Sequence, residues 1–203
     1  MISLILSTFF NFFFLLTPFF VLLLFLDVCK DKNVKERKKI AFKTTGYILG
    51  ICLVILFFGN TIFSTLGITL IAFQIGSGLI LLLSGIGMMK DNTVKTRVVS
   101  SNSDPSLIPL TLPITVGPGT VGALFILGSK VTSLPVSSLI CSILGIFLAV
   151  FAIWLLLFYS NFILKIIGYN GLKVLSKLTG LFLSILAIQS ILNGITSFIG
   201  TLK

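Results

Sequence analysis

The stretch "PLTLPITVGPGT" at residues 109–120 interrupts an otherwise strongly apolar part of the chain. It carries three prolines and two glycines where a membrane helix would be expected to run straight. Proline removes a backbone donor and clashes with the carbonyl four residues earlier. Glycine adds backbone freedom that a helix must suppress. We therefore expect a helix break at Pro113 and Pro118, inside a hydrophobic segment.

The composition of the chain indicates whether this break is surrounded by water or by lipid. Of the 203 residues, 56% are hydrophobic and 10% are charged, and the mean hydropathy is +1.18. Soluble domains carry about 25% charged residues, so the polar side chains here are too few to cover a surface that faces water. The sequence predicts an integral membrane protein whose main partner is the lipid bilayer.

Six segments are apolar and long enough to cross a membrane, which takes about 20 residues in a helix. We therefore predict an all-α, polytopic bundle of six transmembrane helices in a single domain, residues 1–203. The expected spans are 2–26, 44–63, 66–89, 107–129, 134–160 and 179–200.

The basic residues predict the orientation of these spans. The chain has 15 Lys and Arg against five Asp and Glu, and nearly all of the cations fall in the links 27–43, 90–106 and 161–178. Only Lys130 and Lys203 fall on the opposite side. The positive-inside rule then places the three links in the cytoplasm and both termini outside. Such clusters attract anionic headgroups; with little aromatic interleaving, they do not indicate nucleic acid.

The polar link 90–106 divides the chain into halves, 1–89 and 107–203, of three spans each. An odd number of spans forces the halves into opposite orientations, as in transporters with inverted repeats. Pro18 interrupts the first helix of one half, and Pro113 to Gly119 interrupt the first helix of the other. The alternative is an ordinary proline kink in each, because prolines are common in membrane helices.

Several kinds of chemistry lack the residues they need. The sequence contains no histidine, and its five acids, Asp27, Asp31, Glu36, Asp91 and Asp104, fall in or beside the links. A serine–histidine pair, a metal cage and an intramembrane carboxylate relay are therefore not expected. We predict a protein that is not an enzyme and that has no metal and no cofactor.

The backbone around the fourth-span break is the first candidate site. A half-helix that starts near Gly117, Pro118 and Gly119 would direct the free amides of residues 119–121 at the middle of the membrane. Helix N-termini attract anions, and glycine admits a small carboxylate close to the backbone. Thr115 and Thr120 can add hydroxyl groups. The alternative is a strained bend that neighbouring threonines satisfy.

The third and sixth spans carry small and polar stripes. Amides occur at Gln74, Gln189 and Asn193, which can hold helices together or contact a solute; for Gln74 we favour helix packing, and for the pair on the sixth span a polar cavity. Asn11 in the first span is a weaker candidate of the same kind. The glycines that we assign to helix packing are Gly67, Gly78, Gly85, Gly180 and Gly194.

Three motifs resemble those of the MarC family, also called UPF0056 membrane proteins. They are "FSTLGITLIAFQIGSGLILLLSGIGMM" in the third span, "PLTLPITVGPGTVGALFIL" in the fourth and "LTGLFLSILAIQSILNGI" in the last. The resemblance implies a six-helix protein of the bacterial cytoplasmic (inner) membrane, related to the LysE-type exporters. One branch of that family is regarded as carrying small neutral amino acids.

The chain departs from the family pattern at two places. The first helix reads "LLTPFFVLLLF" and retains only Pro18 of a motif that usually holds Asp or Asn before the proline, a nearby glycine and a second proline. Gln74 stands where an arginine is common in the family.

Two functions remain open. The first is a secondary transporter or exporter of small solutes, neutral amino acids above all, with the substrate between Gly117–Thr120, Gln74 and the Gln189–Asn193 face. The second is a membrane scaffold or assembly factor that transports nothing, in which the broken helix is only a packing device. A homo-oligomer is compatible with either function.

Overall fold

The computed structural model describes residues 2–67, 69–90, 111, 115–129 and 136–201. Within these ranges the chain is helical, with no strand. The helices are α1 (Ile2–Leu15), α2 (Pro18–Val28), α3 (Val34–Leu66), α4 (Leu70–Met89), α5 (Pro118–Ser129), α6 (Val136–Phe158) and α7 (Ser160–Thr201). The all-α membrane bundle expected from composition is confirmed.

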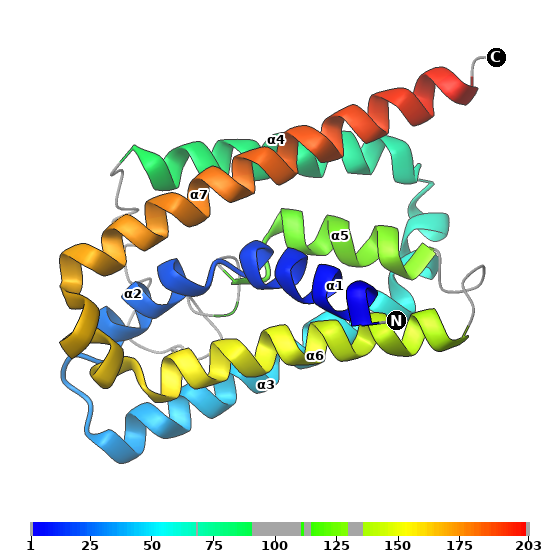
Figure 1. Ribbon diagram of the computed structural model, residues 1–203. Coiled ribbons are helices and arrows are strands. Elements are labelled where there is room, and N and C mark those ends of the chain that lie inside the picture. Colours follow the sequence, from blue (N-terminus) through cyan, green and yellow to red (C-terminus); the bar gives the residue numbers. More distant parts are fainter. Residues whose placement is uncertain (1, 68, 91–110, 112–114, 130–135, 202–203) are drawn as a thin grey trace.

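Two pairs of long helices enclose the shorter ones. α4 lies along α7, α3 lies along α6, and α1, α2 and α5 occupy the space between the pairs (Figure 1). If the two halves are repeats of each other, α2 corresponds to α5, α3 to α6 and α4 to α7. The contact between α4 and α5 then has its counterpart between α7 and α2, and the contact between α3 and α5 has its counterpart between α6 and α2. The contacts agree with the exchange expected of inverted repeats, in which α2 and α5 each begin at a proline.

The number of spans is only partly established. Four helices (α3, α4, α6 and α7) are long and apolar enough to cross a membrane, and the bent pair α1–α2 makes a fifth span if it is counted as one. α5, with 12 residues, is too short to cross alone. The rest of the expected fourth span, including Pro113, lies almost wholly outside the described residues, as does the link 90–106 beyond Lys90.

Two of the expected links are largely helical, which corrects their boundaries. α3 begins at Val34 and α7 at Ser160, so both helices extend well beyond their apolar segments. At α3 the cause is a capping box: the Glu36 amide donates to Asn33 Oδ1 (2.9 Å), and the Asn33 amide donates to Glu36 Oε2 (3.1 Å). α7 contains one non-helical residue, Gly168 (φ 72°), where its axis changes direction (Figure 1).

Arg37, one turn into α3, ties three segments together. Its guanidinium donates to the carbonyls of Lys30 (3.1 Å) and Lys32 (3.0 Å), in the turn after α2. It also donates to Asn161 Oδ1 (2.6 Å) at the start of α7. The basic links of the two halves therefore meet at one end of the bundle, whereas the N- and C-termini lie at the other end (Figure 1).

The first span breaks between α1 and α2, which meet at an angle of 43°. Pro18 occupies the first position of α2, and Thr17 before it adopts a left-handed conformation (φ 49°, ψ 57°). A β-branched residue rarely adopts this conformation. Thr17 is only 7% exposed, and its hydroxyl has no hydrogen-bond partner. The break at Pro18 is therefore strained, and more than a simple proline kink.

Glycines let α4 and α7 approach closely. A Cβ on Gly85 would lie 2.6 Å from the Gly180 carbonyl, and one on Gly180 would lie 2.7 Å from the Gly85 carbonyl. Gly78 and Gly194 also lie at this contact, against Ile191 and Ile75. Gly67 does not: it is exposed, a Cβ there would meet nothing within 4 Å, and its φ of 65° serves the turn before α4. Its assignment to helix packing was wrong.

The outer faces of the long helices are strongly apolar. Leu83 on α4, Phe58 on α3 and Phe147 on α6 are 63%, 62% and 51% exposed. Soluble proteins do not expose apolar side chains on this scale, and lipid tails are the environment that fits them.

Replacement of Gly85 tests the α4–α7 contact. We expect Gly85→Leu to lower the thermal stability of the purified protein by about 1–3 kcal/mol, or to prevent folding, because overpacking forces the two backbones apart. Gly87→Leu is the matched control, since a Cβ at Gly87 meets nothing within 4 Å. Equal melting temperatures for the two variants in detergent would contradict this account of the contact.

Candidate functional site

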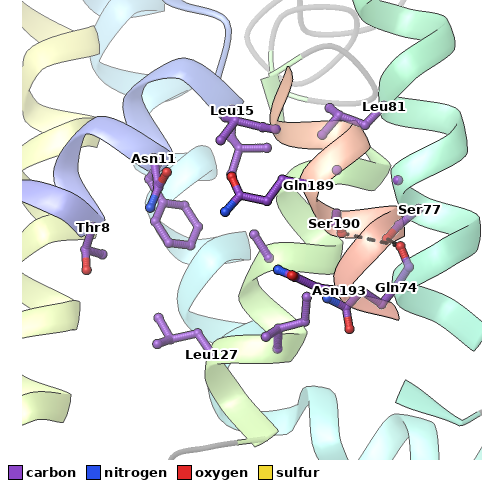
Figure 2. A pocket seen from close by; sticks show the side chains of 16 residues that line it. Thr8, Asn11, Leu15, Gln74, Ser77, Leu81, Leu127, Gln189, Ser190 and Asn193 are labelled. Carbon is purple, nitrogen blue, oxygen red and sulfur yellow. Dashed lines mark hydrogen bonds between the residues drawn. The ribbon is translucent and has the colours of Figure 1, made fainter. Parts of the chain in front are cut away.

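A pocket of about 360 Å³ lies between α1, α4, α5 and α7 (Figure 2). Its walls combine apolar side chains with hydroxyl and amide groups from three helices. The polar lining residues are Thr8 and Asn11 on α1, Gln74 and Ser77 on α4, and Gln189, Ser190 and Asn193 on α7.

The side-chain amides converge from opposite walls. Gln189 extends from α7 towards α1, where Asn11 faces the same space, and Gln74 and Ser77 lie on the α4 side (Figure 2). Ser190 Oγ donates a long hydrogen bond to the Gln74 carbonyl (3.5 Å) and so joins α7 to α4. Each primary amide offers both donors and acceptors, so the pocket can satisfy a solute that carries both kinds of group.

Burial shows which end of the pocket is accessible. Asn11, Gln189 and Asn193 are exposed, whereas Leu15, Leu81 and Gly119 are buried. Along α1 the lining therefore runs from accessible residues near the N-terminus to buried ones at the helix break. The pocket opens towards the end of the bundle that carries the chain termini and closes at the two breaks.

The two broken helices hydrogen-bond to each other at the closed end. Thr120 Oγ1 lies 3.2 Å from the carbonyl of Leu15, the last residue of α1, and 3.3 Å from the carbonyl of Thr115. Thr115 and Thr120 are buried, and the Val116 amide donates to the Thr111 carbonyl five residues earlier (2.9 Å), a wider turn than in an α-helix. The single hydroxyl of Thr120 thus lies within hydrogen-bond distance of a carbonyl from each of the two breaks.

α5 packs against α4 through two glycines at the pocket wall. The α-carbon of Gly119 lies directly against the Leu81 side chain, and a Cβ on Gly122 would lie 2.6 Å from Ser77 Oγ. At Gly119 the glycine therefore serves a close helix contact as well as lining the pocket. A larger residue there would disturb packing and the pocket together.

The structure separates the expected site residues into two groups. Gln74, Gly119, Gln189 and Asn193 line the pocket. Thr115, Gly117, Pro118 and Thr120 belong to the break below it, where Pro118 begins α5. One detail was wrong: the Val121 amide donates to the Gly117 carbonyl (3.0 Å), so of the three amides expected to be free, only those of Gly119 and Thr120 remain candidates.

Three lining residues were missed by sequence reasoning, and Asn11 was underrated. Ser77 lies three residues after Gln74 on α4, and Thr8 lies three residues before Asn11 on α1. Residues at this spacing share a helix face. A search for polar residues three apart would have found both pairs. Ser190 lies three residues before Asn193 on α7, so the same search would have found it as well.

The described lining of the pocket carries no formal charge. No Asp, Glu, Lys or Arg is among its described lining residues, and no group of three or more His, Cys, Asp or Glu occurs in the described ranges. The polar lining consists of dipoles rather than charges.

The sequence comparisons place the chain in a family. A profile described as "MarC family integral membrane protein" matches residues 2–199. The chain belongs to the MarC family. It is therefore an integral membrane protein, and the resemblance seen in the third, fourth and last spans is confirmed.

Named MarC-family relatives match the chain over most of its length. The UPF0056 membrane protein of Methanocaldococcus jannaschii is 31% identical over 187 residues, which cover 89% of this chain and 90% of the relative. The UPF0056 inner membrane protein MarC of Citrobacter koseri is 28% identical over 202 residues, with 92% and 91% covered. No solved structure was found to match.

Removal of the Thr120 hydroxyl tests the bond between the breaks. We expect Thr120→Val to lower the free energy of unfolding by about 1–3 kcal/mol, because the buried Leu15 carbonyl loses a donor. Thr120→Ser retains the donor and should stay close to wild type. Thr196→Val is a control at an exposed hydroxyl of α7. If Thr120→Val melts at the same temperature as Thr120→Ser, the hydroxyl contributes nothing to the fold.

Proposed function

We propose that this MarC-family protein is a secondary transporter of small neutral solutes, with neutral amino acids as the leading candidates, in a bacterial cytoplasmic membrane. The observation that carries the proposal is the pocket: four side-chain amides from α1, α4 and α7 face a cavity of about 360 Å³ that ends at two broken helices. A charged solute would enter this uncharged cavity without a counter-ion, at a high desolvation cost.

The breaks add a second kind of contact to the amides. Of the two ends of a zwitterion, the carboxylate suits the backbone amides at the start of α5, where Gly119 lines the pocket. The ammonium group suits side-chain oxygens such as those of Asn11 and Gln189. Broken helices with a polar site between them are the arrangement by which transporters bind substrates without buried charge.

Coupling through a buried carboxylate is not part of the proposal, because no described acid lines the pocket. Sodium held by carbonyls and hydroxyls, or uncoupled flux, fits the available groups better. The basic links favour the cytoplasm for their end of the bundle. Both termini then lie outside, and the described conformation is open outwards.

The scaffold alternative predicts an occluded bundle without a polar cavity at mid-depth. The pocket runs counter to that prediction. The close contact between Gly119 and Leu81 supports a packing role for α5, but packing alone gives no reason for amides to converge from three helices.

Removal of two amides tests transport directly. We expect Gln189→Leu/Asn193→Leu to reduce uptake of labelled alanine or glycine into proteoliposomes at least tenfold, because two pairs of donors and acceptors are lost from the pocket wall. Ser84→Leu, which adds an apolar side chain to an exposed position of α4, should transport like wild type.

Gly119→Val is a poor test by itself, because the added side chain would clash with the Leu81 side chain. The folded state of each variant is therefore checked by its melting temperature before flux is compared. Equal flux in wild-type, double-variant and empty vesicles would remove the transport proposal for these solutes. A stable co-purified partner without any solute-dependent stabilisation would then favour the scaffold.

A further inference from the structure

A second, wholly different concavity lies on the outer side of the bundle. It has a volume of about 590 Å³ and is formed by α1, the end of α6 and the start of α7. Its lining is apolar or aromatic throughout: Phe9, Phe13, Ala152, Leu155, Leu156, Tyr159, Phe162 and Ile163. This groove shares no residue with the polar pocket.

The groove faces outwards at the level where α6 gives way to α7. Tyr159 and Phe162, at its end, are 53% and 62% exposed. From Ala152 to Tyr159 it follows α6 for about 10 Å at the helical rise of 1.5 Å per residue. A lipid-exposed apolar groove of this shape suits a single extended hydrocarbon chain.

Cations of α3 and α7 lie near the end of the groove that Tyr159 and Phe162 form. Lys165 follows Phe162 by three residues on α7, so the two share a helix face. From α3, Lys38 Nζ lies 4.5 Å from the centre of the Phe158 ring, and Arg37 binds Asn161. Both α3 cations thus touch the segment that closes the groove.

Acids do not balance these cations on the groove-forming helices. α1, α6 and α7 contain no Asp or Glu. The acids of the neighbouring α2–α3 region are Asp27, Asp31 and Glu36, and Glu36 is bonded to the Asn33 amide. Residues 27–43 carry seven Lys and Arg against these three acids, so the basic end beside the groove has a net positive charge and favours an anion there.

The start of α7 has the character of a helix that lies in a membrane interface. Phe162 and Ile166, one turn apart, are both strongly exposed, with Lys165 beside them, and the helix turns away at Gly168. Apolar residues next to a lysine place such a helix at the boundary between acyl chains and headgroups. The groove thus begins where phospholipid headgroups lie.

We propose that this groove binds one anionic phospholipid of the bilayer, with an acyl chain along Phe9, Phe13 and Leu155 and its phosphate beside Lys38 and Lys165. The apolar groove supplies shape, and the two lysines supply selectivity over zwitterionic lipids. The inference does not depend on transport, since it concerns the outer surface of the bundle.

A tryptophan inside the groove provides the readout. The single native tryptophan, Trp154, does not line the groove, so the reporter chain carries Trp154→Phe/Leu155→Trp, which moves the tryptophan to a groove position. Bromine atoms on an acyl chain quench tryptophan fluorescence only at short range. The full reporter chain is reconstituted in mixtures of phosphatidylglycerol and phosphatidylcholine, with either lipid brominated in turn. We expect brominated phosphatidylglycerol to quench the reporter tryptophan at a several-fold lower mole fraction than brominated phosphatidylcholine.

Two matched pairs of variants separate a site from diffuse attraction. Lys38→Gln/Lys165→Gln should lower the preference for phosphatidylglycerol by about fivefold for each lysine removed. Lys39→Gln/Lys177→Gln removes the same charge from the same two helices and should change it much less. Ala152→Phe, which fills the groove, should abolish the preference. Leu148→Phe, on an exposed position of α6 outside the groove, should not.

Three results would overturn the proposal. The first is equal quenching of the reporter chain by the two brominated lipids. The second is an equal loss of preference when the two double-lysine substitutions are made in the reporter chain, which would indicate general attraction to the basic end. The third is a concentration-dependent dimer that shields the reporter tryptophan from both lipids, which would mean that a second copy of the chain covers the groove.

Discussion

The requirement to satisfy backbone polar groups in hydrocarbon governs this structure. A broken helix leaves carbonyls and amides without partners, and lipid offers none. Here the cost is met by bringing the breaks together: Thr120, just inside α5, donates to the carbonyl of Leu15, the last residue of α1. The pairing of the breaks fixes α5 against α1, and this contact forms the closed end of the polar pocket.

Glycine residues have two separate roles near the closed end of the pocket. Along α4 and α7 it permits carbonyls of one backbone to approach the other, as at Gly85 and Gly180, which holds the two outermost helices of the pocket in register. At Gly119 it lets α5 approach Leu81 while lining the pocket. Glycine therefore contributes both to the packing of α4 on α7 and to the wall of the polar pocket.

Much of the fold followed from the sequence, because hydropathy and charge report directly on lipid and water. The helix ends followed less well. Hydropathy located the apolar part of α3 but not its start at Val34, although the capping residues Asn33 and Glu36 were readable. The site was half predicted: Gln74, Gln189 and Asn193 are amides in apolar helices and attract notice. The Thr120–Leu15 bond joins residues 105 positions apart, and no local pattern encodes such a contact.

Arg37 has a consequence for how the two halves of the chain are held together. Its guanidinium reaches the turn after α2 and Asn161 on α7, and thereby joins the first half of the chain to the second at the basic end. The exposed residues of the polar pocket, such as Asn11 and Asn193, belong to the other end of the bundle. Two direct bonds between the halves therefore occur at separate levels: one charged and exposed, at Arg37, and one neutral and buried, between Thr120 and Leu15.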